Sequence, residues 1–322
     1  MDSINSFINQ IKNSQTIAIF THINPDGDTL GSATGLKNFI TTNFDNKDVT
    51  LVVCSEIPEV FGFLPGIKDV VHYSKIDETT IFDLAIATDV AAKDRMGVAL
   101  TFFEKAKSKI NIDHHITNNE YGVFNYVVPE ASSASEVVYS LIVQTEYEIS
   151  QDTATCLYTG ICTDTGNFKH DNTAPKVLMI AGELAKKGAI PSKISTYVYS
   201  SKPKEMFMLS AYAMNNTVFV ENDKIAYAVI TQKDLQKFGA KNEHAEGIVE
   251  QIKDIKKVEI AILFKEINKD QTKVSMRTKS VDSTKIAEKF GGGGHKFASG
   301  CTINRPYKIA VDKFIEEVRK YF

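Results

Sequence analysis

The chain has 322 residues, of which 43% are hydrophobic and 24% are charged, and its formal net charge is −3. This length is enough for about two domains with separate cores, and the composition excludes collagen-like, disulfide-scaffold and disordered proteins. No stretch approaches the roughly 20 apolar residues of a membrane span, and the first fifteen residues lack the pattern of a secretory signal, so we expect a cytoplasmic protein without a membrane partner.

Short apolar runs alternate with helical patterns along the first half of the chain. The runs predict strands that are buried on both faces of a sheet, and they cover residues 16–22, 49–54, 83–89 and 109–115. Helical periods cover residues 29–43, 97–108 and 132–145. This alternation predicts an α/β domain in which a parallel sheet has helices on both faces.

The second half begins with mostly helical residues over 151–187, which a polar loop at 163–175 interrupts. A Lys-rich stretch follows, so we predict a first domain over 1–187, a linker over 188–205 and a second domain over 206–322. In the second domain, alternating strands at 217–220, 224–230, 258–266 and 273–279 are interspersed with helices. This pattern predicts a smaller α/β domain with a mixed or antiparallel sheet, which we expect to lie across a cleft from the first.

Acidic residues and histidines follow the apolar runs of the first half. The residues in these positions are His22, Asp26, Asp28, Asp89, Asp113, His114, His115 and Asp164. Because the carboxyl ends of parallel strands share one edge of a sheet, where ligands bind, we expect these side chains to meet there.

Carboxylates in such number require cations or protons to neutralise them. Two divalent ions would balance Asp26, Asp28, Asp89 and Asp164, and the imidazoles of His22 and His114 would complete the ligand shells. Mixed carboxylate and imidazole ligands favour Mn²⁺, and Mg²⁺ less well. Asp89 is our candidate for a bridging ligand, whereas Asp28 could instead cap a helix. A pair of such ions about 3.5–4 Å apart activates water for displacement at phosphorus.

These motifs resemble those of the DHH phosphoesterase superfamily. The matching segments are HINPDGD (22–28), the strand-end Asp89, IDHH (112–115) and GICTDTG (160–166). Further along, VSMRTK (274–279) and IAEKFGGGGHKFASG (286–300) resemble the DHH-associated domain of the first type. Motif order, spacing and length are most similar to the stand-alone NrnA-type nanoRNases of bacteria. Those enzymes hydrolyse short oligoribonucleotides and dephosphorylate 3′-phosphoadenosine 5′-phosphate.

The resemblance implies roles for individual residues. The ligands of two Mn²⁺ would be His22, Asp26, Asp28, Asp89, His114 and Asp164. Among the catalytic residues, Asp113 would orient an imidazole and His115 would face the substrate phosphate. Ser133 lies in a segment that flanks the site in the family, although it could equally cap the helix over 132–145. Arg95 would reach a phosphate, and the chain would form a homodimer.

The second half provides a candidate nucleotide site at Arg277, Gly291, Gly292, Gly293, Gly294 and His295. Four consecutive glycines often form a flexible linker, but here they lie between a helical and a strand-like pattern. Glycine backbone can approach a phosphate closely, and Arg277 can form a bidentate fork with one. Residues 186–322 carry a net charge of +9 and residues 1–185 a net charge of −12. This asymmetry fits an anion-binding and a cation-binding half, or simply two solvated surfaces.

We therefore predict a Mn²⁺-dependent phosphoesterase that acts on short single-stranded RNA or small nucleotides. An alternative is hydrolysis of signalling dinucleotides such as c-di-AMP or linear pApA, which relatives perform. A non-catalytic nucleotide-binding protein is a further alternative, which the complete ligand set disfavours. Inorganic pyrophosphatases share the metal-binding half, but their C-terminal domain differs and has no counterpart of the GGGGH segment.

Overall fold

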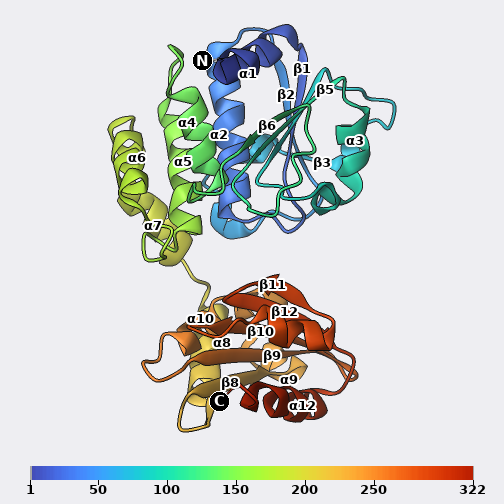
Figure 1. The fold of residues 1–322 in the computed structure, drawn as a ribbon, viewed down its shortest axis with the longest axis vertical. Coiled ribbons are helices and arrows are strands. Elements are labelled where there is room, and N and C mark those ends of the chain that lie inside the picture. The colour runs from blue at the N-terminus through green and yellow to red at the C-terminus, as the bar shows by residue number, and fades with distance from the viewer. Residues whose placement is uncertain (1, 322) are drawn as a thin grey trace. The chain divides into compact units, whose positions relative to one another are not determined.

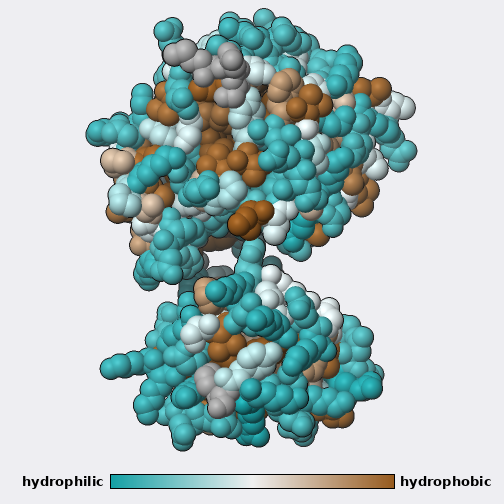
Figure 2. Space-filling view, in the orientation of Figure 1, coloured by the Kyte–Doolittle hydropathy of each residue, from teal (hydrophilic) through white to brown (hydrophobic). Residues whose placement is uncertain are grey.

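The structure is a computed structural model that describes residues 2–321 (Figure 1). It divides into two units between Ser201 and Lys202, and each unit is described by itself below. Figure 2 shows that hydrophilic side chains cover most of the visible face of each unit. Within residues 2–321, no helix combines the length and the apolar composition needed to cross a membrane.

The first unit is built on a six-stranded sheet in the order β3-β2-β1-β4-β5-β6, with every neighbouring pair parallel. The strands are β1 (Thr16–Phe20), β2 (Asp48–Val53), β3 (Val71–His72), β4 (Leu84–Thr88), β5 (Ser108–Asp113) and β6 (Phe124–Val127). The four predicted strands are the four central ones. The two edge strands were not predicted, because β3 has only two residues and β6 is half-exposed along its whole length.

Helices cover both faces of this sheet, as predicted. They are α1 (Asp2–Asn13), α2 (Gly27–Asn43), α3 (Leu100–Lys105), α4 (Ala134–Ile142), α5 (Gln151–Asp164), α6 (Pro175–Lys186) and α7 (Pro191–Tyr199). Alternate residues of β1 point to opposite faces. Ile17 and Ile19 join the core beneath α1, α2, α4 and α5, whereas Ala18 and Phe20 pack on the α3 side.

The segment expected to be a linker, 188–205, is largely helical in the structure. It contains α7 and the beginning of α8, and the division between the units falls near its end. Helix α7 packs on the first unit through the buried Ile194. Tyr197 stacks on Phe63 at 4.5 Å between ring centroids, and the hydroxyl of Tyr199 donates to the Cys162 carbonyl at 3.0 Å. These apolar and aromatic contacts explain why the Lys-rich composition of this stretch was misleading.

The second unit contains a mixed six-stranded sheet in the order β11-β12-β10-β9-β8-β7, in which only β8 and β9 are parallel. The strands are β7 (Val218–Val220), β8 (Ile225–Ile230), β9 (Ile260–Asn268), β10 (Gln271–Thr278), β11 (Gly293–His295) and β12 (Ala298–Ile303). The helices are α8 (Lys204–Asn215), α9 (Gln232–Phe238), α10 (Ile248–Lys253), α11 (Thr284–Ala287) and α12 (Tyr307–Arg319).

The helices of the second unit leave part of one sheet face uncovered. Helix α12 packs on one face, where its Phe314 contacts Phe264 of β9. Helices α8, α9 and α10 pack on the other face, against small residues of β8 and β9 such as Ala228 and Ala261. An open pocket lies over β10 and β12.

Candidate metal centre and nucleotide pocket

The structure brings the acids and histidines of the first unit together beyond the carboxyl ends of its strands. His22 follows β1, Asp89 follows β4 and His114 follows β5, while Asp26 caps α2 and Asp28 lies in its first turn. Strands β1 and β4 are the neighbours at which the strand order reverses. Open parallel sheets bind their ligands at this point, so the fold itself positions these side chains.

Asp164 reaches the same place from a helix. It is the last residue of α5, in agreement with the helical pattern predicted from residue 151 onward. Helix α5 can lie very close to α2 because glycines meet at their contact. A Cβ atom built on Gly31 would be 2.7 Å from the backbone nitrogen of Gly160. This close packing carries Asp164 to the edge where the strands end.

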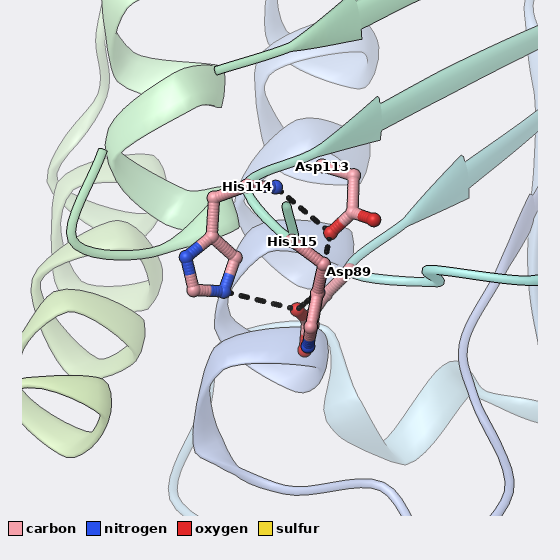
Figure 3. Close-up of side chains that lie close together, drawn as sticks. All are labelled: Asp89, Asp113, His114 and His115. Carbon is pink, nitrogen blue, oxygen red and sulfur yellow. Dashed lines mark hydrogen bonds and ion pairs between the residues drawn. The ribbon is translucent and has the colours of Figure 1, made fainter. Parts of the chain in front are cut away.

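Three overlapping groups have ligand atoms that all lie within 4.8 Å of one another. The groups are His22, Asp26 and Asp89; Asp28, His114 and Asp164; and Asp89, Asp113, His114 and His115. In Asp89, Oδ2 is 3.5 Å from Nε2 of His22. Its Oδ1 is 3.6 Å from Nε2 of His114, as Figure 3 shows. Two tetrahedral ligands at about 2.1 Å from one ion are about 3.4 Å apart. The distances from the two Asp89 oxygens to the two imidazoles therefore suit a carboxylate that would give one oxygen to each of two ions.

Asp89 has a strained backbone conformation and a buried side-chain oxygen without a hydrogen bond. Its φ of 59° lies in the left-handed region, which costs about 1 kcal/mol or more in a residue other than glycine. Its N–H donates to the Ile112 carbonyl at 3.0 Å, and this bond fixes it beside β5. Its Oδ1 is buried and accepts no hydrogen bond. A buried carboxylate oxygen without a donor is costly, and a cation would satisfy it.

The two candidate histidine ligands share one orientation. Nδ1 of His22 lies 2.8 Å from the Ile23 carbonyl, and Nδ1 of His114 lies 3.3 Å from the Ala131 carbonyl. Because only a protonated Nδ1 can donate to these carbonyls, Nε2 is the ligating atom in the neutral tautomer. Both Nε2 atoms face the carboxylates. Metal-binding histidines commonly show this arrangement.

Asp113 and His115 form a separate hydrogen-bonded pair. Oδ1 of Asp113 accepts from Nδ1 of His115 at 2.8 Å and from the His114 N–H at 2.8 Å, while Asn118 donates to Oδ2 (Figure 3). Asp113 is fully buried, and the side chain of His115 is 28% exposed. This hydrogen bond raises the pKa of His115. The imidazole is thus oriented by a carboxylate and can hold a proton at the surface of the site.

Asp28 is bound to the beginning of α4. Its Oδ2 accepts from the Ala134 N–H at 2.6 Å and its Oδ1 from the Ser135 N–H at 3.0 Å. Ser133 is the N-cap of this helix, with a fully buried hydroxyl that accepts from the Glu136 N–H at 3.0 Å. We predicted a substrate contact for Ser133. Because its side chain is fully buried and cannot touch a substrate, Ser133 has the capping role instead.

The titration of the cluster follows from its burial and its crowded carboxylates. Burial lowers the pKa of His22 and His114, but the neighbouring carboxylates outweigh it and raise both to about 10. Burial, reinforced by neighbouring carboxylates, raises the pKa of Asp28 well above its usual range and that of Asp164 to about 7. Without cations, the cluster therefore holds protons at neutral pH, and divalent ions would replace them.

Arg95 is exposed on the turn that precedes α3. Its carbonyl accepts from the Ile23 N–H at 2.7 Å, so this turn adjoins the segment that carries His22. The structure thus places the backbone of Arg95 close to the metal-site loop.

The second unit gathers most of its predicted site residues in the open pocket. The lining residues are Lys273, Val274, Ser275, Arg277, Gly291, Gly292, Gly293, Ala298, Ser299, Gly300, Cys301 and Thr302. Arg277 donates to Glu250 at 2.9 Å and to the Met276 carbonyl at 3.0 Å. Gly294 and His295 lie in the exposed strand β11 and do not line the pocket.

The glycine run has a structural role that the sequence did not reveal. A Cβ on Gly292 would lie 2.2 Å from the Gly300 carbonyl, and one on Gly294 would lie 2.6 Å from the Ala298 carbonyl. Glycine at these two positions lets β11 lie against β12. Gly293 differs, because a Cβ there would meet nothing within 4 Å. Only Gly291 and Gly293 are thus free of close neighbours within the run.

Several groups that shape the two sites were missed in the sequence. The backbone N–H groups of Ala134 and Ser135 have no sequence signature, since every residue except proline has one. Asn118 could have been found as a polar residue shortly after IDHH, in a loop close to its carboxylate. Glu250 could not, because α10 and β10 are far apart in the sequence.

Comparison with known proteins gives concordant results over both units. Residues 16–161 match the DHH family, N-terminal domain, and residues 222–322 match the DHHA1 domain. A probable bifunctional oligoribonuclease and PAP phosphatase NrnA of Streptococcus mutans is 32% identical over 99% of both chains. The bifunctional oligoribonuclease and PAP phosphatase NrnA of Bacillus subtilis is 30% identical over 89% of both. The crystal structure of an exopolyphosphatase-related protein from Bacteroides fragilis superposes with a TM-score of 0.93 at 28% identity, over 99% of this chain and 96% of that one.

Proposed function

Since the chain belongs to the DHH family and is therefore a hydrolase that acts on phosphoric esters, we propose that it cleaves oligoribonucleotides of two to a few nucleotides to nucleoside 5′-monophosphates. We further propose that it dephosphorylates 3′-phosphoadenosine 5′-phosphate to AMP. The observation that carries the proposal is the position of Asp89, which joins two groups of candidate ligands beside the Asp113–His115 pair.

The donor set fits two divalent cations. His22, Asp26 and Asp89 would hold one ion, and Asp28, His114 and Asp164 the other. Asp89 would also contribute to the second site, since its Oδ1 lies 3.6 Å from Nε2 of His114. The buried and unsatisfied Oδ1 of Asp89 supports this assignment. When bound, two Mn²⁺ or Mg²⁺ ions would lower the pKa of a water molecule and stabilise negative charge at phosphorus.

The protein's own residues provide the orientation and the proton transfer. The N–H groups at the beginning of α4 fix Asp28, and the Ile112 carbonyl fixes Asp89. His115, oriented by Asp113 through its Nδ1, would present Nε2 to the substrate and donate a proton to the leaving oxygen. The hydrogen bond to Asp113 raises the pKa of His115 and so favours the protonated imidazole.

The nucleotide would be recognised by residues outside the metal centre. Arg277 would form a charge-assisted fork with a phosphate, and the exposed backbone at Gly293 would allow close approach of the ligand. The exposed Arg95 would add a cation near the metal centre, and His295 would contribute from β11. The homodimer expected from the resemblance and the cytoplasmic location expected from the sequence belong to the same proposal.

Hydrolysis of signalling dinucleotides remains the second candidate. The same cluster would serve a cyclic or linear dinucleotide equally well, because the reacting group is a phosphodiester in each case. A substrate panel separates the two candidates. We expect the kcat/KM for the linear dinucleotide ApA and for 3′-phosphoadenosine 5′-phosphate to exceed that for c-di-AMP in the presence of Mn²⁺.

The central experiment is hydrolysis of a labelled dinucleotide by the wild-type chain and by Asp89→Ala, with Mn²⁺, with Mg²⁺ and with EDTA. We expect hydrolysis only with a divalent ion, and a loss of at least about 1,000-fold in the variant. Asp94→Ala, which removes an exposed carboxylate from the following turn, is the matched control and should retain activity. Unchanged turnover in Asp89→Ala would contradict the proposal.

A further inference from the structure

The pocket of the second unit is lined by two cations, and only one of them belongs to the motifs described above. Lys273 and Arg277 project from the same face of β10, together with Ser275 between them, because alternate residues of a strand share a face. The intervening Val274 and Met276 are fully buried in the core on the opposite face. Lys273 and Arg277 thus line one continuous pocket.

Small residues form the floor between the two cations. Ser275 pairs with Gly300 of β12, and Arg277 pairs with Ala298. Lys273 and Arg277 are four residues apart on β10, so their Cα atoms are about 13 Å apart. Arg277 is also tied to Glu250. This spacing favours two separate phosphate groups of one ligand over a single phosphate shared by both side chains.

Lys273 stands directly opposite another lysine. It pairs in register with Lys265 of β9 and with Thr302 of β12. Like charges directly opposite in an antiparallel pair are destabilising. The Lys265 amine is half-buried and donates to the Asn242 carbonyl at 3.1 Å. The pKa of Lys265 is lowered by burial and then by the charge of Lys273. The charge of Glu246 offsets only part of this lowering.

No acidic side chain within residues 2–321 forms an ion pair with Lys273 or Lys265. The neighbouring cation differs in this respect, because Arg277 has Glu250. Lys273 lines the open pocket and Lys265 lies directly opposite it, and because neither has an ion-paired carboxylate, they create a local positive potential. An anion placed beside Lys273 would neutralise this potential and relieve the repulsion.

We propose that Lys273, with Lys265 behind it and the Thr302 hydroxyl beside it, binds a second phosphate of the nucleotide whose first phosphate is bound at Arg277. The identity of the ligand as a short nucleotide rests on the proposed function, whereas the second phosphate site rests on the pocket itself. A dinucleotide with a 5′-phosphate should therefore bind more tightly than the same dinucleotide without one.

Calorimetric titration of the full chain in EDTA with pApA and with ApA tests this directly, since binding is measured without cleavage. We expect the wild type to bind pApA about tenfold more tightly than ApA, which corresponds to one charge-assisted contact of about 1.4 kcal/mol. Lys273→Gln should lose this preference and keep the same affinity for ApA. Lys308→Gln should keep the preference, because Lys308 is exposed on α12, which packs on the opposite face of the sheet.

The outcomes separate this inference from the proposed function. If Lys273→Gln retains the preference for pApA, or if the wild type has none, the second phosphate site is refuted, whatever the enzyme cleaves. If the preference depends on Lys273 but neither dinucleotide is hydrolysed with Mn²⁺, the site stands and the proposed function fails. A melting temperature of Lys273→Gln equal to or above that of the wild type, as expected when the repulsion from Lys265 is removed, shows that the exposed substitution leaves the fold intact.

Discussion

The metal centre and the nucleotide pocket are built on opposite physical principles. In the metal centre most side chains are buried or half-buried, although Asp26 is exposed, and hydrogen bonds fix several positions, as the contacts of Asp28 and Asp113 show. The nucleotide pocket is open, and its floor consists of residues with little or no side chain between two cations. A reacting group needs a fixed position, whereas a recognised group needs space and an opposite charge. A small substitution should therefore have a much larger effect in the first site than in the second.

Among substitutions that leave every candidate ligand in place, the largest effect is expected from Gly160→Ala in α5. The added Cβ would lie 1.9 Å from Oγ of Ser135 and 2.8 Å from Oδ1 of Asp28, so one methyl group would displace a candidate ligand. A displacement of about 1 Å in a catalytic site can cost about 100-fold in rate. We expect the hydrolysis of a dinucleotide in Mn²⁺ to fall by about that factor or more in steady-state assays.

Gly182→Ala is the matched control for this substitution. Gly182 lies in α6, where a Cβ would meet nothing within 4 Å, and replacing glycine by alanine in a helix is stabilising by about 0.5–1 kcal/mol. Its activity should equal that of the wild type. Full activity in Gly160→Ala would show that the site adapts and that its rigidity has been overestimated.

The next effect is a pH dependence of the affinity for Mn²⁺, which comes from the protons that the metal centre holds. Because the pKa values of His22 and His114 are raised to about 10, both imidazoles hold an additional proton at pH 7, and a divalent ion must displace it. The affinity for Mn²⁺ should therefore rise with pH between 6 and 9, by up to about tenfold per pH unit for each proton displaced.

Calorimetric titration of Mn²⁺ at pH 7, in buffers with different ionisation enthalpies, counts the protons released. We expect more than one proton per chain, and fewer in His22→Ala than in the wild type. The half-buried His72, in β3, provides a control variant, His72→Gln, which should release as many protons as the wild type. An affinity that is independent of pH would contradict the charge balance proposed for this site.

The sequence was most informative where burial leaves a regular pattern. The four central strands of the first unit are buried on both faces, so their apolar runs and the residues that follow them could be recognised. Asp164 also follows an apolar run, which lies in the stretch from residue 151 that was predicted to be helical and forms α5. Helix α7 was missed because its apolar residues, such as Ile194, are few and its neighbours are lysines. Contacts between distant segments, such as Arg277 with Glu250, are set by the tertiary fold and have no local pattern.

A smaller effect is expected from the glycine run of the nucleotide pocket. Gly293→Ala adds a methyl group at the pocket without meeting a neighbour, so it should leave the melting temperature unchanged and weaken the binding of a dinucleotide several-fold. Gly292→Ala would place its Cβ 2.2 Å from a carbonyl oxygen and should lower the melting temperature as well. Thermal denaturation and calorimetry distinguish the two. Wild-type affinity in Gly293→Ala would show that the ligand does not approach this backbone.

The smallest effect is expected from Ser133→Ala, which separates helix capping from substrate binding. Loss of an N-cap hydroxyl costs about 1 kcal/mol of stability, and Ser150→Ala, at the N-cap of α5, should cost about the same. Because the bonds from Ala134 and Ser135 to Asp28 come from the backbone, they survive the substitution. The KM for a dinucleotide should therefore stay within about twofold of the wild type in both variants. A KM that rises tenfold in Ser133→Ala alone, at a stability equal to that of Ser150→Ala, would return Ser133 to the substrate-binding residues and show that the first site also contains an adaptable element.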